Sequence, residues 1–240
     1  MRKACGVCAN ILTYFSSIIK PGMTTLELDR IAEDRIRAAG CTPAFKGYRG
    51  FPFTICTSVN DEVVHCKPSE RPLKDGDILT VDIGAVYEGF YSDTAKTFTV
   101  GQVSDKTNEL IKVGYESLLE GVKKAVDGNF VEDISNAVYQ YATSKGFGVV
   151  DEYVGHGIGT ELHEDPRISN TPTKRQTPQL SNGMVICIEP ILTIDKSGAV
   201  KNLSQWEVKT VDGSVAVHWE HTIAILPSGP EILTLRDEER

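Results

Sequence analysis

Long apolar runs are absent from this 240-residue sequence, and basic residues are in the minority. No uninterrupted apolar segment approaches the roughly 18 residues needed to span a bilayer, so we expect no membrane partner. The net charge of -8 argues against a nucleic-acid partner, because phosphate contacts need a basic patch. The six cysteines are too few for a disulfide framework in so long a chain, and they fit reduced thiols in the cytoplasm best.

The N-terminal segment raises the question of a signal peptide. Arg2 and Lys3 precede a moderately apolar stretch, but polar residues interrupt it and no small-residue cleavage site follows. Ile11, Leu12 and Phe15 recur at helical spacing. The segment therefore predicts an amphipathic first helix.

An internal repeat with an offset near 106 residues is the main organisational signal. A turn at Gly22 opens a predicted helix that closes at Gly40, and a turn at Gly128 opens another that closes at Gly146. Each helix is followed by a β-rich segment that begins with a glycine turn and ends in a carboxylate. The pattern predicts one duplicated α+β domain whose halves, about 1–110 and 111–240, share a sheet and form a site at their interface.

The two carboxylates of the first half lie on a predicted hairpin. Residues 78–86 and 90–100 are typical of strands, and the turn between them lies midway between Asp82 and Asp93. We therefore expect these aspartates to be direct cross-strand partners, with Cβ atoms about 5 Å apart. A solvated polar face is the alternative, but the neighbours of Asp82 are apolar. Buried paired carboxylates need a cation or a raised pKa, which predicts a divalent-metal site.

Residues 215–225 predict a single strand in the second half. Period-2 counting puts Glu220 on one face with His218, and His221 on the opposite face with Trp219 and other apolar residues. We interpret His221 as a core histidine. The pattern leaves His218 either near the site or at the surface.

Two further histidines lie in a glycine-rich segment, where glycines next to His156 would let the backbone approach a ligand. His163 is seven residues further on, which indicates a different role.

Four carboxylates and one imidazole suit two divalent ions, namely Mn, Fe or Co, with Zn as a further candidate. Two such ions would hold a bridging hydroxide as the nucleophile. His65 and His163 become candidates for hydrogen bonding to substrate and for oxyanion stabilisation. The predicted ligands are Asp82, Asp93, His156, Glu189 and Glu220.

Taken together, these motifs resemble type I methionine aminopeptidases, and the resemblance extends from Arg2 to Leu235. The residues that carry it are Val59–His65, Val81–Gly84, Ser92–Thr94, Gly155–Gly159, His163–Pro166, Ile188–Pro190 and Glu220–Thr222.

The resemblance implies the pita-bread fold, with two pseudo-symmetric halves, a curved antiparallel sheet and helices on its outer face. It implies a monomer that removes the N-terminal methionine from nascent proteins, with the ribosome as a candidate partner. The five predicted ligands match the family's dinuclear site, His65 and His163 its catalytic histidines, and Glu189 its proton shuttle. The implied substrate-binding residues are Tyr48, Phe51, Cys56, His65, Leu162, His163 and Trp206.

Some positions differ from the family pattern. Phe51 stands where tyrosine is usual, and Leu162 where phenylalanine is frequent. Cys66 replaces a glycine, and we expect ordinary β geometry there, with the thiol partly exposed at the pocket rim.

Several kinds of protein share such a fold. Xaa-Pro aminopeptidases and prolidases usually carry an extra N-terminal domain, whereas only about 20 residues precede the first repeat helix here. A non-catalytic binding protein with this fold would typically lack ligands, and all five are present. A type II methionine aminopeptidase would contain an insert of about 60 residues in its second half. Methionine aminopeptidase of type I is therefore the leading prediction.

Overall fold

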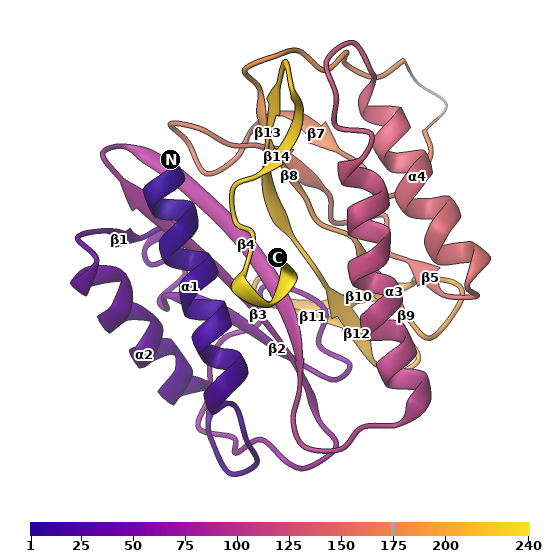
Figure 1. Cartoon of the computed structure of the whole chain (residues 1–240). Coiled ribbons are helices and arrows are strands. Elements are labelled where there is room, and N and C mark those ends of the chain that lie inside the picture. Colours follow the sequence, from indigo (N-terminus) through magenta and orange to yellow (C-terminus); the bar gives the residue numbers. More distant parts are fainter. Residues whose placement is uncertain (174–175) are drawn as a thin grey trace.

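The computed structural model describes residues 1–173 and 176–240, which form two halves with a helix pair each (Figure 1). In that view α1 and α2 lie to the left of the strands, and α3 and α4 to the right. The α-helices are α1 (Arg2–Ile18), α2 (Thr25–Ala38), α3 (Asp105–Val122) and α4 (Val131–Ser144), and short 3₁₀ turns span Tyr48–Gly50 and Asp237–Glu239. The strands are β1 (Thr42–Pro43), β2 (Ile55–Val59), β3 (Ile78–Tyr87), β4 (Phe90–Thr99), β5 (Gly148–Val149), β6 (Gly155–Gly157), β7 (Glu164–Ile168), β8 (Val185–Ile188), β9 (Ile191–Thr193), β10 (Val200–Ser204), β11 (Glu207–Thr210), β12 (Ala216–His218), β13 (His221–Leu226) and β14 (Gly229–Ile232).

The strands pair antiparallel throughout the described residues. In the first half, β3 pairs with β1, β2 and β4. In the second half, the order β14-β13-β8-β6-β7 forms one sheet and β12-β9-β5 another, while β10 and β11 form a separate hairpin.

The repeat found in the sequence is visible in the backbone. Helices α2 and α4 have the same length and lie 106 residues apart. The turns before them also match, because Gly22 N donates to Leu73 O at 2.8 Å and Gly128 N donates to Leu180 O at 3.0 Å. Both glycines have positive φ, 91° and 86°, which a residue with a Cβ rarely adopts. The same turn therefore opens the same helix in each half.

Side-chain caps define where two of the helices begin. Thr24 Oγ1 accepts from Glu27 N, and Glu27 Oε2 in turn accepts from Thr24 N at 2.7 Å, which makes a capping box at the start of α2. Ser104 Oγ accepts from Thr107 N at 3.1 Å at the start of α3. A cap of this kind contributes about 1 kcal/mol to the free energy of unfolding.

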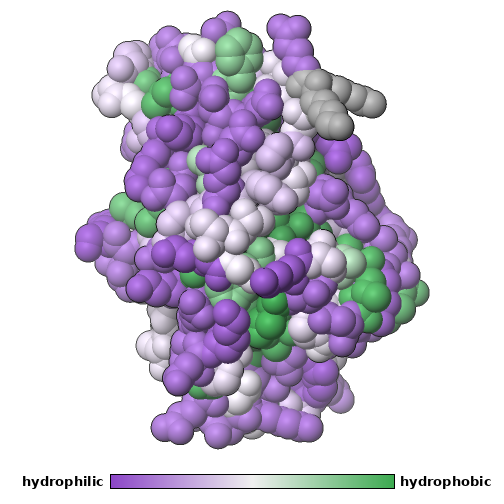
Figure 2. All heavy atoms as spheres, turned by 90° about the vertical axis from the view of Figure 1, so that its right-hand side faces the viewer, coloured by the Kyte–Doolittle hydropathy of each residue, from purple (hydrophilic) through white to green (hydrophobic). Residues whose placement is uncertain are grey.

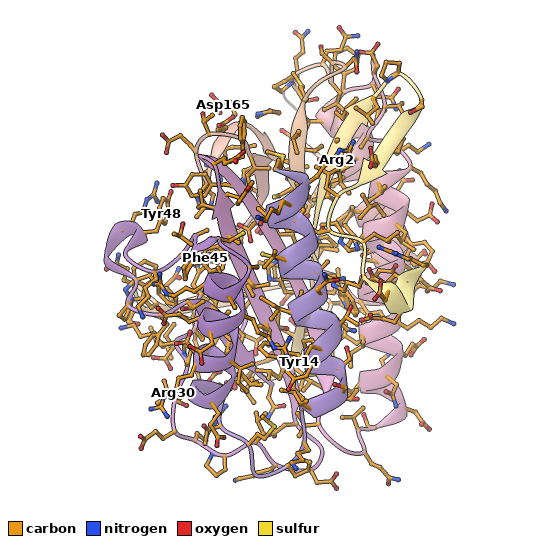
Figure 3. The ribbon with its side chains drawn as sticks, turned by 60° about the vertical axis from the view of Figure 1, so that its left-hand side comes forward. Arg2, Tyr14, Arg30, Phe45, Tyr48 and Asp165 are labelled. Atoms are coloured by element: carbon orange, nitrogen blue, oxygen red, sulfur yellow. The ribbon has the colours of Figure 1, made fainter. Side chains whose placement is uncertain are left out.

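Each half has its own hydrophobic core beneath its helix pair. In the first, α1 packs onto β3 and β4, and α2 packs onto β1 and β2. In the second, α3 packs onto β8, β9 and β12, and α4 packs onto β5 and β7. Figure 3 shows α1, labelled at Arg2 and Tyr14, beside α2, labelled at Arg30. Leu12 and Phe15 of α1 are fully buried. The predicted amphipathic first helix is therefore present, and burying each such side chain contributes about 1.5–3 kcal/mol.

The hairpin of β3 and β4 has a different register from the one expected. Gly84 pairs with Asp93 and Asp82 with Ala95, so the two aspartates are diagonal neighbours and the prediction of direct partners is wrong. The turn contains only Glu88 and Gly89, both with positive φ, rather than three residues. Because the shift is by two residues, both aspartates still point to the same face of the sheet.

The predicted strand 215–225 is interrupted, which also corrects the sequence interpretation. β12 ends at His218 and β13 begins at His221. Trp219 N donates to Pro190 O, and Glu220 N donates to Ala95 O of β4 at 3.0 Å. The chain passes here from the sheet of β9 to the sheet of β8, and β8 and β9 are themselves separated at Glu189 and Pro190. Both breaks therefore place a glutamate where the two halves meet.

The outer surface is largely polar on the α4 side. Figure 2 shows that side, where hydrophilic residues cover most of the face and a group of hydrophobic residues lies near its lower middle. None of the helices in the described part of the chain has the length and hydropathy that a membrane crossing requires.

Candidate metal centre

Four carboxylates converge at the seam between the halves. Asp82 and Asp93 come from the β3–β4 hairpin, whereas Glu189 and Glu220 occupy the two strand breaks of the second half. Asp82, Asp93 and Glu220 each offer an oxygen, and these three atoms lie within 4.8 Å of one another. Thr222 Oγ1 donates to Asp93 O at 2.6 Å, and Thr94 Oγ1 donates to Glu220 O at 2.7 Å. Hydrogen bonds across the seam thus hold the two sets of carboxylates together.

His156 completes the predicted ligand set. Its Nε2 lies 3.9 Å from Asp93 Oδ2 and 3.8 Å from Glu189 Oε1. Its Nδ1 lies 2.8 Å from Gly157 O, which orients the ring and leaves Nε2 toward the carboxylates. The structure therefore brings all five predicted ligands into one cluster.

The carboxylates of the cluster are buried beside one another, which makes their negative charges unfavourable. Burial, together with its carboxylate neighbours, raises the pKa of Asp93 and of Glu220 well above the usual range. Burial also raises the pKa of Asp82 to about 7 and that of Glu189 to about 8. Asp82 Oδ1, Asp93 Oδ1 and Glu220 Oε1 are buried without a hydrogen-bond partner. Bound cations would compensate these charges, and oxygen donors with one imidazole fit divalent ions of intermediate hardness.

The glycines beside His156 have another function than the one expected. A Cβ on Gly155 would lie 2.1 Å from Cys187 O of β8, and one on Gly157 would lie 2.2 Å from Asp165 O of β7. Both neighbours are backbone atoms that cannot move aside. The glycines therefore allow β6 to pack between its sheet neighbours, which fixes the position of His156, a role that the sequence pattern did not predict.

A cavity of about 150 Å³ opens beside the carboxylates. Every residue predicted to bind substrate lines this cavity, and so do Asp82 and Asp93 of the carboxylate cluster. Its walls are mainly apolar and aromatic, which suits a flexible thioether side chain. Phe45 and Arg49 also line it, and sequence reasoning missed both. Figure 3 shows Phe45 and Tyr48 in the loop that follows β1. The predicted lining residues are Tyr48, Phe51, Cys56, His65, Leu162, His163 and Trp206.

The two candidate catalytic histidines differ in their surroundings. The ring of His163 lies 4.3 Å from that of His156, centroid to centroid, and its Nδ1 is 2.8 Å from the Tyr48 hydroxyl. Burial lowers the pKa of His65 to about 4. Partial burial and the nearby His156 likewise lower the pKa of His163 to about 4. Both rings are therefore neutral at neutral pH and can donate a hydrogen bond.

Cys66 does not lie where the sequence analysis placed it. The side chain is buried, with 4% of the residue exposed, so the prediction of a partly exposed thiol at the pocket rim is wrong. Its O accepts from Thr57 N of β2 at 2.8 Å, which ties the segment to the sheet and covers the thiol. The positive φ lies instead at His65, 62°, a conformation that histidine tolerates better than most residues.

His218 and Cys187 are further side chains at the cluster. His218 is buried rather than at the surface, and its Nε2 is 3.8 Å from Glu189 Oε2. The period-2 pattern had already placed it on the face of Glu220. Cys187 is fully buried in the hydrophobic cluster that also contains Phe51, Cys56 and Leu162, and no sequence signal pointed to it. His221 is buried, with its Nδ1 2.9 Å from Thr234 Oγ1, in agreement with a core histidine.

A second and more open cavity, of about 510 Å³, lies on the other side of the two candidate catalytic histidines. Arg49, His65 and His163 line both cavities, so the two meet at these side chains. Glu189 and His156 form part of its wall. The two cavities therefore meet beside the carboxylate cluster.

A buried arginine near the C-terminus forms hydrogen bonds with strand β4, which carries Asp93. Arg236 Nη2 donates to Thr94 Oγ1 at 2.8 Å and to Ala95 O at 2.7 Å, next to Asp93. Its Nη1 donates to Glu239 Oε1 at 2.6 Å, and Arg236 itself has no exposed surface. The terminal segment thus binds the strand that carries one of the central carboxylates.

Replacing this arginine should destabilise the fold strongly. We expect Arg236→Met to lower the free energy of unfolding by about 3–5 kcal/mol, because it leaves the buried Glu239 without its cation. Urea unfolding would measure the change. Arg240→Met is a matched control, since its exposed pair with Asp237 at 3.5 Å should contribute at most about 1 kcal/mol. Equal losses in both variants would contradict this account.

Comparisons with known proteins agree with the site. The sequence profile of metallopeptidase family M24 matches residues 1–227. The methionine aminopeptidase of Clostridium acetobutylicum is 48% identical over 236 residues, which cover 98% of this chain and 94% of that protein. The crystal structure of methionine aminopeptidase from Thermotoga maritima superposes with a TM-score of 0.94 at 40% identity, over 98% of this chain and 94% of that one. The chain therefore belongs to metallopeptidase family M24 and, within it, to the methionine aminopeptidases.

These findings also decide between the alternatives. The prolidase of Pyrococcus furiosus superposes with a TM-score of 0.80 over 98% of this chain, but its 24% identity shows the fold alone, and only 63% of that chain is covered. The pita-bread fold class and the resemblance predicted from the motifs are confirmed, as is aminopeptidase activity over the prolidase and non-catalytic alternatives.

Proposed function

We propose that this chain is a metal-dependent aminopeptidase that removes the N-terminal methionine from peptides and nascent proteins, with residues 1–240 acting as one catalytic unit. The observation that carries the proposal is the apolar cavity of about 150 Å³ that opens directly onto the carboxylate cluster. Its lining is mainly apolar and aromatic and includes the sulfur of Cys56, so it suits a single apolar side chain such as that of an N-terminal methionine.

The residues that would hold the metal are Asp82, Asp93, His156, Glu189 and Glu220. Their four carboxylates would balance two divalent ions, for which Mn, Fe and Co are the leading candidates and Zn a further one. Such ions, when bound, activate a water molecule as the nucleophile and polarise the carbonyl of the bond to be cleaved.

The apolar wall positions the substrate. Phe51 and Trp206 pack edge to face, with ring centroids 5.1 Å apart, and form a rigid surface for the methionine side chain. Cys56 and Leu162 lie in the same buried cluster. Filling this space excludes water from the reacting carbonyl and places it next to the carboxylates.

The histidines and Glu189 handle charge and protons. Donation from the Tyr48 hydroxyl to His163 Nδ1 leaves the proton of that ring on Nε2, which can then donate to the carbonyl oxygen as negative charge develops. His65, which also lines the cavity, can bind the adjoining peptide group. The Glu189 carboxylate would take a proton from the attacking water and deliver it to the leaving amine.

The cellular setting is part of the proposal. All six cysteines are free thiols, which supports a reducing compartment, and we propose the cytoplasm. We further propose that the protein acts as a monomer on the N-termini of peptides and of chains leaving the ribosome.

The decisive assay compares two tripeptides on protein reconstituted separately with Mn, Fe, Co and Zn. We expect release of methionine from Met-Ala-Ser and no cleavage of Ala-Pro-Ala. Cleavage of Ala-Pro-Ala alone would support a prolidase-like activity instead, and cleavage of neither with bound metal would contradict the proposal. The ion that gives the highest activity at cellular concentrations would identify the physiological metal.

Metal removal should also lower thermal stability. At an ion concentration of about 100 Kd the bound state gains about 2.7 kcal/mol, which corresponds to about 5–10 °C in Tm for a chain of this size. We expect a chelator to lower Tm by that amount, because the buried carboxylates then repel one another. The chelator should have little effect on Asp93→Asn. An unchanged Tm for the wild type would argue against ions at this cluster.

A further inference from the structure

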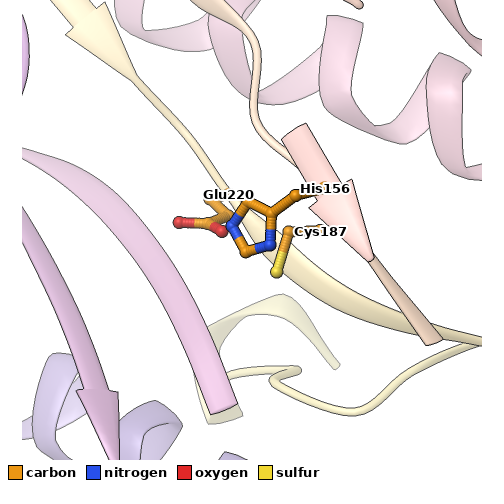
Figure 4. A group of neighbouring side chains, drawn as sticks. All are labelled: His156, Cys187 and Glu220. Carbon is orange, nitrogen blue, oxygen red and sulfur yellow. The ribbon is translucent and has the colours of Figure 1, made fainter. Parts of the chain in front are cut away.

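We propose that Cys187 gives this metal centre a sulfur ligand, so that a thiophilic divalent ion binds between His156, Cys187 and Glu220. The inference rests on the proposed metal centre and extends it by a donor outside the five predicted ligands. The ligand atoms of the three residues, a ring nitrogen, Sγ and a carboxylate oxygen, all lie within 4.8 Å of one another. Figure 4 shows the three side chains converging from β6, β8 and the break before β13.

The strand pairing explains why the thiol lies at this position. Cys187 of β8 pairs with Thr222 of β13, two residues after Glu220. On the other side of β8, Gly157 of β6 pairs with Ile186, which brings His156 beside Cys187. The central strand of the second half therefore carries Cys187 between the imidazole and the glutamate, on the framework that positions both predicted ligands.

Cys187 is held only weakly by its other contacts. Its Sγ lies 3.7 Å from Thr222 Oγ1, which is a long contact, and the residue is fully buried. Glu220 provides a second and independent observation. Its Oε1 is buried and has no partner, and the residue is only 2% exposed. A buried carboxylate oxygen without a partner, next to a buried sulfur and an imidazole, is a donor set that lacks its cation.

The chemistry of this set differs from that of the carboxylates beside it. Nitrogen, sulfur and one oxygen favour Zn²⁺, Cd²⁺ or Co²⁺, whereas Asp82 and Asp93 provide oxygen donors that suit Mn²⁺. As the ion binds, the thiol releases its proton to solvent, and the thiolate with the Glu220 carboxylate balances the divalent charge. Zinc bonds of about 2.0–2.3 Å require only small side-chain movements from the present separation. Cys187 should therefore determine how strongly the centre retains thiophilic ions.

Cadmium is a direct probe, because a cadmium–thiolate bond has an ultraviolet charge-transfer band that oxygen and nitrogen ligands do not produce. We would titrate the metal-free full-length protein with Cd²⁺ and follow this band and the affinity, and then repeat the titration with Mn²⁺. The variants are Cys187→Ser and Cys187→Thr, with Cys56→Ser as the matched control. Cys56 is a second buried thiol of the same hydrophobic cluster but is absent from the group of His156, Cys187 and Glu220.

We expect the band in the wild type and in Cys56→Ser, and its loss in both Cys187 variants. Cd²⁺ affinity should fall at least 10-fold without Cys187, whereas Mn²⁺ affinity should change less than about 3-fold. Two variants are used so that a misfolded one, recognised by circular dichroism, does not decide the result. Three results would overturn the inference: no band in the wild type, a band that survives in a folded Cys187 variant, or equal loss in Cys56→Ser. A protein that binds Mn²⁺ and cleaves Met-Ala-Ser but shows no band would refute this inference alone, whereas one that binds no divalent ion would refute the metal centre itself.

Discussion

Asp93→Asn should abolish methionine release and remove most of the bound metal. Asp93 is 5% exposed, its Oδ1 has no partner, and its carboxylate lies close to those of Asp82 and Glu220 and to the His156 ring. The amide retains the shape of the side chain but lacks the charge that would bind a cation. Loss of a residue that only supports a ligand weakens metal binding about 10–100-fold, so loss of a ligand should cost more. Metal analysis after dialysis, together with the Met-Ala-Ser assay, would measure both effects.

In the metal-free protein, by contrast, Asp93→Asn should increase thermal stability. Without a cation, Asp93 is a buried carboxylate beside two others, so its neutral analogue should raise the Tm of the metal-free form. Glu88→Gln is the matched control, because it removes one negative charge at the exposed turn of the same hairpin. Glu88→Gln should retain both metal and activity. Full turnover by Asp93→Asn with two ions still bound would disprove the dinuclear assignment, and the same test applies to Asp82→Asn.

His163→Ala should slow turnover by roughly 10²–10³-fold and leave the metal content unchanged. The ring lines the cavity next to the carboxylates, is neutral at neutral pH, and is oriented through its 2.8 Å contact with the Tyr48 hydroxyl. Loss of one donor to a developing oxyanion typically costs this factor. Steady-state kinetics should show the loss in kcat rather than in KM, because the interaction strengthens only as charge develops.

His156 provides the control, because it is assigned as a metal ligand whereas His163 is assigned as a hydrogen-bond donor to the substrate. The rings of His156 and His163 are only 4.3 Å apart, yet His156→Ala should lose both metal and activity. His163→Gln retains a donor and should lose less activity than His163→Ala. If metal content falls together with activity in His163→Ala, His163 is a ligand and the assigned roles are wrong.

Much of the architecture could be read from local patterns in the sequence. The glycine turns at 22 and 128 and the helices that follow them repeat in the structure, because positive φ and amphipathic spacing are properties of short segments. The alternation along the β3–β4 hairpin likewise placed Asp82 and Asp93 on one face. It did not determine their register, since the two-residue turn at Glu88 and Gly89 depends on backbone twist rather than on the apolar pattern.

Sequence motifs alone indicated the metallopeptidase family and predicted the residues of its candidate centre. Three features were decided only by the tertiary structure: the interruption of a strand at Glu220, the burial of Cys66, and the placement of Cys187 beside His156. Each depends on contacts with distant segments, such as Ala95 O for Glu220, Thr57 N for residue 66 and the β6–β8 pairing for Cys187. Period-2 and helical patterns report which face of an element is apolar. These patterns contain no information about which strands pair with one another. Strand pairing is what brings a thiol, an imidazole and a carboxylate together.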